Sequence, residues 1–271
     1  MKYKRLIFTL LYANGNFHIS RNFRLQKVGN LQWLMDKYKL QNIAFSIDEL
    51  IILNVERNRN VETWDEFLKI IKIISSQAFI PIAAGGGIQC ENQIVDLIKS
   101  GADKVVLNSI LYDVNLNLQG LTKKFGKSTL VASLDFQRQS DNYLMISSNG
   151  LTPMKHHSSH EMLGNVQEYL GELLINSIDR DGTGFGLDLE LTKILPKSLR
   201  IPVILAGGVG NGKHILDGLN QPQINAIATA QLFNFIGDGL RDAFDPRQRR
   251  RLTKKDKERA RAQAKNAALN D

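Results

Sequence analysis

Pro81-Ile-Ala-Ala-Gly-Gly-Gly-Ile88 recurs 121 residues later as Pro202-Val-Ile-Leu-Ala-Gly-Gly-Val209. Each copy is a short apolar run that ends in consecutive glycines, which predicts a buried strand followed by a tight loop. Three more pairs of segments repeat in the same order at offsets of 121 to 124 residues: Val105–Tyr112 with Ala226–Phe233, Asp48–Ile52 with Gly171–Ile175, and Leu6–Leu11 with Leu130–Asp135. The chain is therefore predicted to consist of two similar halves.

Short apolar runs rich in β-branched residues alternate with longer helical patterns across this repeat. The expected strands are Arg5–Tyr12, Glu49–Val55, Ile80–Ala84, Lys104–Leu107, Thr129–Leu134, Glu172–Asn176, Pro202–Leu205 and Ala226–Ala228. The alternation predicts a parallel sheet, and eight strands in about 235 residues favour an α/β fold, a (β/α)₈ TIM barrel built from two similar half-barrels, over a doubly wound sheet. We expect residues 1–246 to form this single barrel, with Asn142–Lys155 as a hairpin or loop over one mouth.

The composition excludes several classes of protein. Hydrophobic residues make up 43% of the 271 residues and charged residues 23%, so the chain can bury a core and is not globally disordered. The single cysteine, Cys90, excludes a disulfide scaffold and any metal site with several cysteine ligands. No apolar run approaches the roughly 18–20 residues of a membrane span, and Leu6–Ala13 is read as a strand rather than a signal peptide. We expect a cytoplasmic protein.

The net charge of +8 comes almost entirely from the end of the sequence. Residues 247–271 contain ten lysines and arginines and three acids, so they carry +7, and the preceding 246 residues carry +1. The nearly neutral body argues against nucleic-acid binding by the barrel. We expect the basic tail to be a solvated helix or a flexible end, and the alternative is a polybasic segment that binds acidic lipid, RNA or a protein partner.

Two glycine-rich loops, related by the repeat, follow the third and seventh expected strands. Loops in these places form the working face of such a barrel. Glycine lets the backbone approach an anion closely, so the paired loops predict a ligand with a phosphate at each end. The predicted phosphate or substrate contacts are Gly86, Gly87, Asn108, Ser109, Gly207, Gly208, Ala230 and Gln231. Gln231 is bulkier than the small residue that such a site usually contains.

Ser177-Ile-Asp-Arg-Asp-Gly-Thr183 follows the sixth expected strand and places more polar groups at the same mouth. Asp179 and Asp181 can orient hydroxyl groups of the ligand, with Gly182 allowing a tight turn. Alternatively, both carboxylates cap the loop in Asx turns. The sequence leaves both interpretations open.

These segments resemble the cyclase subunit of imidazole glycerol phosphate synthase from about Lys4 to Phe235. The resemblance is carried by Lys4–Ile7, Gly85–Ile88, Gly101–Lys104, Ser177–Thr183 and the Gly207-Gly208 loop. It implies a (β/α)₈ barrel that pairs with a glutaminase subunit and needs no cofactor. In that family, ammonia from the glutaminase crosses the barrel and attacks a bis-phosphorylated ribulosyl nucleotide. Cleavage and ring closure then give imidazole glycerol phosphate and an aminoimidazole carboxamide nucleotide.

The family mechanism uses two carboxylates, one after the first strand and one after the fifth, because an acid and a base must flank the substrate. Asp135 matches the second carboxylate, but Leu11 stands at the position of the first. Ile19 and Asn54 replace a further lysine and acid of the family. Leucine cannot transfer a proton, so this loss should lower the rate of the cyclase reaction by about 10²–10⁴-fold. The resemblance implies a cyclase-type enzyme that lacks half of its acid–base pair.

A paralogous branch of the family is similar to this chain in Leu10-Leu11 and in the Ser-Ile-Asp-Arg-Asp-Gly core. That branch works with a glutaminase-like subunit and a separate amidotransferase, and it converts an acetamido group on a bacterial surface-polysaccharide sugar to an acetamidino group. The resemblance implies that this barrel activates a glutaminase and conducts ammonia, with a sugar amidotransferase as a further partner. The alternatives are histidine biosynthesis, with Asp135 plus Asp179 or Asp181 as acid and base, and a catalytically silent scaffold that only stimulates its glutaminase.

Four charged residues stand at the starts of expected strands: Arg5, Glu49, Lys104 and Glu172. Barrel interiors are normally filled by Val, Ile and Leu, so two cations and two anions inside would have to compensate one another. From the residues alone, they can equally be surface residues at strand ends. The resemblance implies that they form the salt-bridge gate at the entrance for ammonia.

Two further features resemble functional sites. His156, His157 and His160 have a spacing that can bind zinc, but no nearby carboxylate or cysteine completes a ligand set, so we expect no metal. Cys90 lies beside the first glycine loop without a basic neighbour to activate its thiol, so we expect no nucleophilic role.

Overall fold

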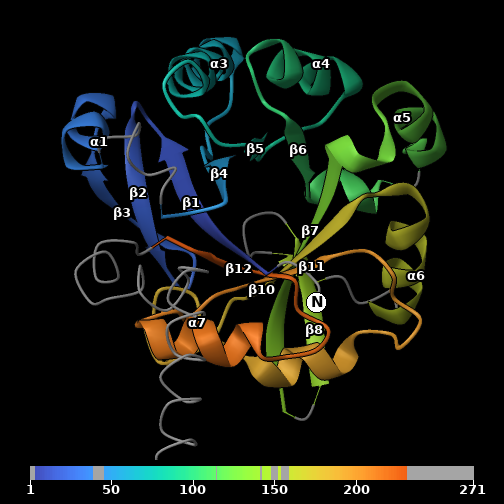
Figure 1. The fold of residues 1–271 in the computed structure, drawn as a ribbon. Coiled ribbons are helices and arrows are strands. Elements are labelled where there is room, and N and C mark those ends of the chain that lie inside the picture. The colour runs from blue at the N-terminus through green and yellow to red at the C-terminus, as the bar shows by residue number, and fades with distance from the viewer. Residues whose placement is uncertain are drawn as a thin grey trace, which may run out of the picture. The chain divides into compact units, whose positions relative to one another are not determined.

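The computed structural model describes residues 4–38, 46–113, 115–140, 142–147, 152–153 and 159–230. Eight parallel strands pair in a closed ring (Figure 1). They are β1 (Arg5–Ala13), β4 (Glu49–Asn54), β5 (Ile82–Gly85), β6 (Lys104–Leu107), β7 (Leu130–Gln139), β10 (Glu172–Ser177), β11 (Val203–Ala206) and β12 (Ala226–Thr229). The ring confirms the predicted (β/α)₈ TIM barrel, and the matched glycine runs end β5 and follow β11, as two similar halves require.

The described residues all belong to the compact unit Met1–Leu232. Gln231, the basic tail of residues 247–271, and His156 and His157 lie outside the described residues. The extent of the barrel domain to residue 246 therefore stays a prediction.

Helices surround the ring in Figure 1. The α-helices are α1 (Leu31–Tyr38), α3 (Val61–Ser75), α4 (Glu91–Lys99), α5 (Leu118–Phe125), α6 (Ser159–Tyr169) and α7 (Gly212–Leu219), and the 3₁₀ helices are η1 (Ser109–Tyr112), η2 (Lys127–Thr129) and η3 (Leu189–Ile194). Helix α3 shows how local sequence sets an element, because Asn60 and Thr63 exchange side-chain and backbone hydrogen bonds in a capping box. Its apolar residues recur at helical spacing and are buried. None of the described helices is long and apolar enough to cross a lipid bilayer.

An apolar belt fills the middle of the barrel. It consists of Ile7, Ile51, Ala83, Val106, Val131, Leu174, Ile204, Ala226 and Ala228, which are all at most 4% exposed. Because these residues come from all eight strands of the ring and pack as one cluster, they can only lie inside it. Helices cover the outer face of the strands, so both faces are buried, and the strands therefore read as continuous apolar runs in the sequence.

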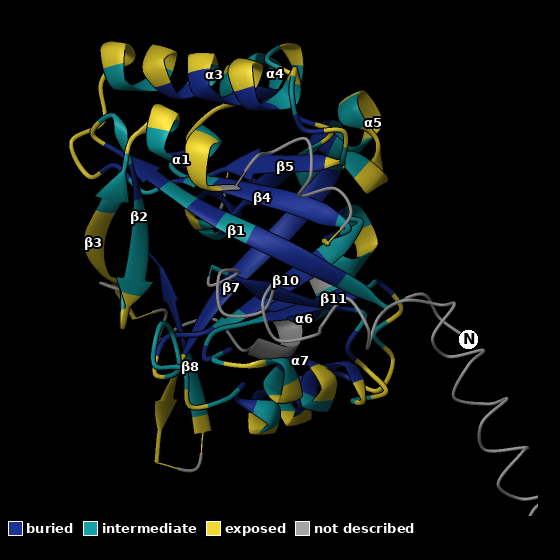
Figure 2. Ribbon diagram, turned by 60° about the vertical axis from the view of Figure 1, so that its left-hand side comes forward, coloured by how far each residue is buried: buried dark blue, intermediate teal, exposed yellow. Residues whose placement is uncertain are grey.

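Two hairpins extend from the ring on the same side (Figure 2). The first is formed by the end of β7 and by β8 (Asn142–Ser147), so it begins before the region Asn142–Lys155 that was predicted as a hairpin or loop; within that region β8 pairs with β9 (Thr152–Pro153). The other, β2 (Asn16–Arg21) and β3 (Arg24–Gly29), follows β1 and was not predicted. Its two-residue turn has positive φ at both Asn22 (50°) and Phe23 (60°), as a type I′ turn requires, but phenylalanine gives no sequence signal for such a turn.

Candidate functional site

A cavity of about 510 Å³ opens at the end of the ring where the strands finish, and every strand or its following loop contributes to the lining. The predicted site residues in the lining are Gly86, Gly87, Asn108, Ser109, Asp135, Asp181, Gly182, Gly207, Gly208 and Ala230. Asp179 does not line the cavity. The structure thus brings together ten of the twelve residues predicted for catalysis and ligand binding, and one of the other two is the undescribed Gln231.

Asp135 lies on the inner face of β7 and is 8% exposed. Its Oδ2 accepts a hydrogen bond from Asn108 Nδ2 at 2.8 Å, and its Oδ1 accepts one from Asn176 Nδ2 at 3.2 Å. Burial raises the pKa of Asp135 to about 6, against the effect of the two amide donors, and the negative charge of Asp181 adds to the rise. Asp135 therefore exchanges protons near neutral pH, as a general acid or base must.

The two glycine loops pack directly on the loop that follows the preceding strand. Gly86 and Gly87 have φ values of +93° and +74°, and Gly207 and Gly208 have +95° and +97°, so all four positions favour glycine. A Cβ on Gly86 would lie 2.2 Å from Asn54 O, and a Cβ on Gly208 would lie 2.2 Å from Gly186 O. The glycines thus bring bare backbone to the cavity wall, which is the arrangement that an anion needs.

Asp179 and Asp181 each hold one of the hairpins. Asp181 Oδ2 accepts hydrogen bonds from Ser20 Oγ at 2.5 Å and from the backbone N–H of Phe23 at 3.0 Å, which fixes the turn between β2 and β3. Asp179 Oδ2 accepts from the backbone N–H of Arg138 at 2.7 Å, on the strand that leads into the second hairpin. A Cβ on Gly182 would lie 1.9 Å from Ser20 O, so the loop and the hairpin touch closely. Both carboxylates have structural contacts, and only that of Asp181 also reaches the cavity.

The side of the cavity next to β1 is mainly apolar and has no carboxylate in the described lining. Its apolar lining residues are Leu11, Ile19, Phe23, Leu25, Leu53 and Val55, and its polar ones are Thr9, Ser20 and Asn54. In the described lining, Asp135 and Asp181 are the carboxylates, and Asp181 is engaged by the hairpin. The β1 side can therefore pack against a ligand, but among the described residues it offers no carboxylate as a general acid or base.

Arg5, Glu49, Lys104 and Glu172 meet at the opposite end of the barrel in a closed ring of alternating charges, the ion ring. Arg5 contacts Glu49 at 2.6 Å and Glu172 at 3.0 Å, and Lys104 contacts the same two carboxylates at 3.0 and 3.2 Å. Glu49 is 2% exposed, and burial raises its pKa while the charge of Lys104 opposes this. Glu172 Oε2 is buried and has no hydrogen-bond partner among the described residues.

Strands β6 and β10 connect the ion ring to Asp135. On β10, Glu172, Leu174 and Asn176 follow one another at every second position; β6 carries Lys104 and Val106 in the same way, and Asn108 comes directly after its end. Residues two apart on a strand share a face and lie about 6.6 Å apart. Each of these two segments thus has an ion-ring residue, a belt residue and a hydrogen-bond donor to Asp135 in order along the barrel.

Residues 44–237 match the protein family described as "Histidine biosynthesis protein". The chain belongs to this family. It is 38% identical over 258 residues to a protein of Parasynechococcus marenigrum (strain WH8102) that carries the provisional name imidazole glycerol phosphate synthase subunit hisF2, with 92% of each chain covered. It is also 32% and 30% identical, over 242 residues in each case, to the imidazole glycerol phosphate synthase subunits HisF of Chlorobium limicola (strain DSM 245 / NBRC 103803 / 6330) and Chlorobaculum parvum (strain DSM 263 / NCIMB 8327). Both matches cover 89% of this chain and 94% of the relative.

Sequence reasoning missed two cations in the cavity of this histidine biosynthesis family barrel, Arg57 and Arg59 in the loop after β4. Arg59 lies over the first glycine loop, because a Cβ on Gly87 would be 2.2 Å from Arg59 Nε. The only signal in the sequence is a pair of basic residues after a strand, which is common on exposed loops.

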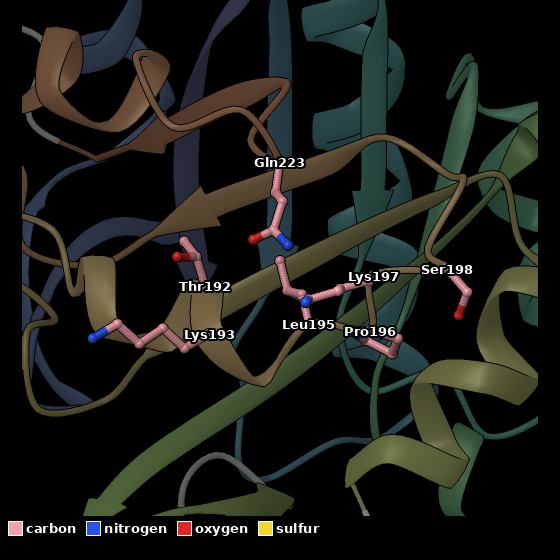
Figure 3. Close-up of a pocket in the computed structure, with 7 residues that line it drawn as sticks. All are labelled: Thr192, Lys193, Leu195, Pro196, Lys197, Ser198 and Gln223. Atoms are coloured by element: carbon pink, nitrogen blue, oxygen red, sulfur yellow. The ribbon is translucent and has the colours of Figure 1, made fainter.

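A second hollow of about 730 Å³ borders the segments that lead into β11 and β12 (Figure 3). It is lined by Thr192, Lys193, Leu195, Pro196, Lys197, Ser198 and Gln223. It contains none of the predicted site residues, and it lies outside the ring at the end away from Asp135. Among the described residues, no group of histidine, cysteine, aspartate or glutamate side chains can hold a metal ion, and Cys90 is free and exposed.

Proposed function

We propose that this barrel is the ammonia-conducting subunit of a glutamine amidotransferase complex, and that the complex serves acetamidino modification of a surface-polysaccharide sugar. In this proposal a glutaminase subunit docks at the ion ring, and ammonia leaves the barrel at the Asp135 cavity for a sugar amidotransferase. The proposal rests on one observation: β6 and β10 both lead from the ion ring, through the apolar belt, to the two asparagines that donate hydrogen bonds to Asp135.

The chemistry of ammonia fits this path. Ammonia is uncharged and small, so it can pass a belt that contains several alanines, whereas ammonium would have to lose its hydration in an apolar interior. The ion ring closes the end of the barrel with charges that are compensated by one another, so it can open by rearranging ion pairs. Water and ammonium are thereby kept from the belt.

The cavity supports delivery rather than the complete cyclase reaction. Asp135 has a pKa near neutrality, so it can take up or supply one proton as ammonia leaves or reacts. Ring formation in the family needs a second proton-handling group on the other side of the ligand. Here the described lining residues on that side, Leu11 and Ile19 among them, include no carboxylate.

Three components test the proposal: this chain, its glutaminase partner and the sugar amidotransferase with its acetamido sugar. Glutamine should support acetamidino formation only when all three are present, and little free ammonia should be detected. Ammonium salt should replace glutamine and the glutaminase. If the barrel stimulates glutamine hydrolysis but the ammonia appears entirely in bulk solvent, the chain is a scaffold and conduction is refuted.

A functional cyclase of histidine biosynthesis is the second candidate, and one observation favours it. Asp181 lines the same cavity as Asp135 and is near enough for its charge to raise the pKa of Asp135. If the hairpin released its Oδ2, Asp181 would be a second carboxylate at the ligand. Supplying the ribulosyl precursor with ammonium salt decides between the two candidates, because turnover at rates usual for the family would require the cyclase function.

A further inference from the structure

The two glycine loops of the cavity differ in the charge that surrounds them. The loop after β5 has Arg57 and Arg59 beside it in the cavity lining. Near the loop after β11, the described cavity lining contains no lysine or arginine. Arg180 lies close to Gly208, since its Cβ would be 3.0 Å from a Cβ added to that glycine, but Arg180 does not line the cavity. The barrel thus has two glycine loops of similar backbone geometry, and only the loop after β5 has positively charged side chains near it in the described lining.

The exposed side chain of Arg59 lies over the first glycine loop. Gly86 packs on the backbone of Asn54, and Gly87 lies beneath the Arg59 side chain, whose Nε would be 2.2 Å from an added Cβ. A larger residue at Gly86 would meet backbone and force the two loops apart, whereas one at Gly87 would displace the Arg59 side chain. The guanidinium group is therefore placed beside backbone that can approach an anion.

The carboxylate nearest to Arg59 does not neutralise it through a direct contact. Glu56 is 3% exposed, and its Oε2 accepts from the backbone N–H of Asn14 at 3.0 Å, while its Oε1 accepts from that of Asn58 at 2.9 Å. Among the described residues Arg59 has neither an ion pair nor a hydrogen bond. Partial burial lowers the pKa of its guanidinium group, and the charge of Glu56 opposes this. A cation without a direct partner beside bare backbone indicates room for an anionic ligand.

We propose that Arg59, with Arg57 in the same cavity lining, completes an anion site at the Gly85–Gly87 loop, so that this loop binds phosphate more tightly than the Gly207–Gly208 loop does. A guanidinium group can donate two parallel hydrogen bonds to a phosphate, which backbone N–H groups alone do not match in charge. The loop at Gly207 and Gly208 is then the weaker of the two phosphate sites. This inference rests on the phosphate ligand that the sequence predicts for the cavity, and it adds which loop binds phosphate more tightly.

Inorganic phosphate tests the inference with the full-length chain at fixed ionic strength, by calorimetric titration. Arg59→Gln should weaken one phosphate site by roughly tenfold or more and leave the second unchanged, since charge-assisted hydrogen bonds to phosphate are lost. Arg59→Lys should recover part of the affinity because it keeps the charge. The matched control is Arg200→Gln, which removes the same charge from an exposed residue outside the cavity.

The possible outcomes separate this inference from the proposed function. If Arg59→Gln binds phosphate as the unchanged protein does, or if Arg200→Gln loses as much affinity, the role of Arg59 is overturned while the phosphate site stands. If the unchanged protein binds no phosphate, the phosphate site and the role of Arg59 in it are both overturned. Ammonia transfer, measured in the three-component assay, tests the proposed function separately from either result. Circular dichroism of each variant shows that a loss of binding does not come from unfolding.

Discussion

Asn176 donates its side-chain amide to Asp135 at 3.2 Å, and it lies four residues after Glu172 of the ion ring on the same strand. One strand therefore reaches from the charged end of the barrel to the buried acid at the other. A shift of β10 by one residue would turn all three of its inner residues outward, because side chains alternate between the faces of a strand. The pairing of β10 with β7 and β11 fixes its register. The same register therefore sets the position of Glu172 in the ion ring and of the Asn176 amide at Asp135.

The raised pKa of Asp135 predicts a pH-dependent contribution to stability. Its folded pKa of about 6 lies above the ordinary value, so the folded protein binds the proton more tightly and the free energy of unfolding falls as pH rises through about 4 to 6. Asp135→Asn removes this effect, so the fall of about 1–3 kcal/mol in the free energy of unfolding between pH 4 and pH 7.5 should disappear. Urea unfolding at several pH values measures it. A fall of the same size in Asp135→Asn would contradict the assigned cause.

The amide donors should control the same pKa. Asn108→Leu removes the 2.8 Å hydrogen bond to Asp135 Oδ2 without adding charge, so the pKa of Asp135 should rise by about one unit. Carbon-13 NMR of the labelled aspartate carboxyl group reports this titration directly. Asn117→Leu is a control, because Asn117 caps helix α5 and does not contact Asp135. An unchanged Asp135 titration in Asn108→Leu would show that the bond does not stabilise the carboxylate.

The ion ring should matter for both stability and coupling. Lys104→Ala leaves Glu49, which is 2% exposed, with one cation fewer and should destabilise the barrel by about 3–5 kcal/mol. Lys193→Ala is the matched control, since its ion pair with Glu190 is exposed and should contribute at most about 1 kcal/mol. In the complex, Lys104→Ala should leave glutaminase docking intact but release ammonia to bulk solvent. Unchanged coupling of glutamine hydrolysis to product formation would refute the gate.

The two aspartates after β10 should control different hairpins. Asp181→Ala removes the hydrogen bonds to Ser20 and Phe23, so the amides of β2 and β3 should exchange with solvent faster. Asp179→Ala removes the bond to Arg138 and should act on β7 and β8 instead. Hydrogen exchange followed by mass spectrometry separates the two effects. If both variants loosen both hairpins, the loop after β10 has simply unfolded and the separate roles are wrong.

The sequence predicts the ring well because its strands are buried on both faces, and because β5 and β11 lead directly into the repeated glycines. The β2–β3 hairpin escapes prediction because its turn places Phe23 at positive φ, where a glycine would usually mark it. The role of Asp181 also depends on a distant residue, since Ser20 lies 161 positions away. The contact between its carboxylate and the hairpin can be predicted only when the closure of the barrel is known.

The residues of the candidate site also differ in whether the sequence alone could predict them. The glycine loops could be found because the repeat marks them twice. The ion ring could be found only through the resemblance, because charges at strand starts are typical of surface positions. Arg57 and Arg59 could not be found, since nothing in a loop sequence shows that Gly87 leaves space for a guanidinium group above it.

A substitution of Leu11 tests most directly whether the cavity delivers ammonia rather than catalysing ring closure of the ribulosyl precursor. Leu11 lies on β1 in the cavity lining, next to Leu53 of β4 in the strand register. Leu11→Asp would add a carboxylate at the position where the family has one, and partial burial near Asp135 would raise its pKa toward neutrality. With the ribulosyl precursor and ammonium salt, the unchanged protein should turn over about 10²–10⁴-fold more slowly than is usual for the family, and Leu11→Asp should turn over measurably faster than the unchanged protein.

Leu53→Asp is the matched control for that experiment, because it places the same charge in the same cavity on the neighbouring strand. The gain in Leu11→Asp should stay below the 10²–10⁴-fold that a complete acid–base pair contributes, since Ile19 and Asn54 still replace two further polar residues of the family. Equal turnover in both variants would mean that any added carboxylate suffices. Turnover by the unchanged protein at the rate of Leu11→Asp would mean that Asp135 already has a working counterpart, with Asp181 as the described carboxylate available for that role.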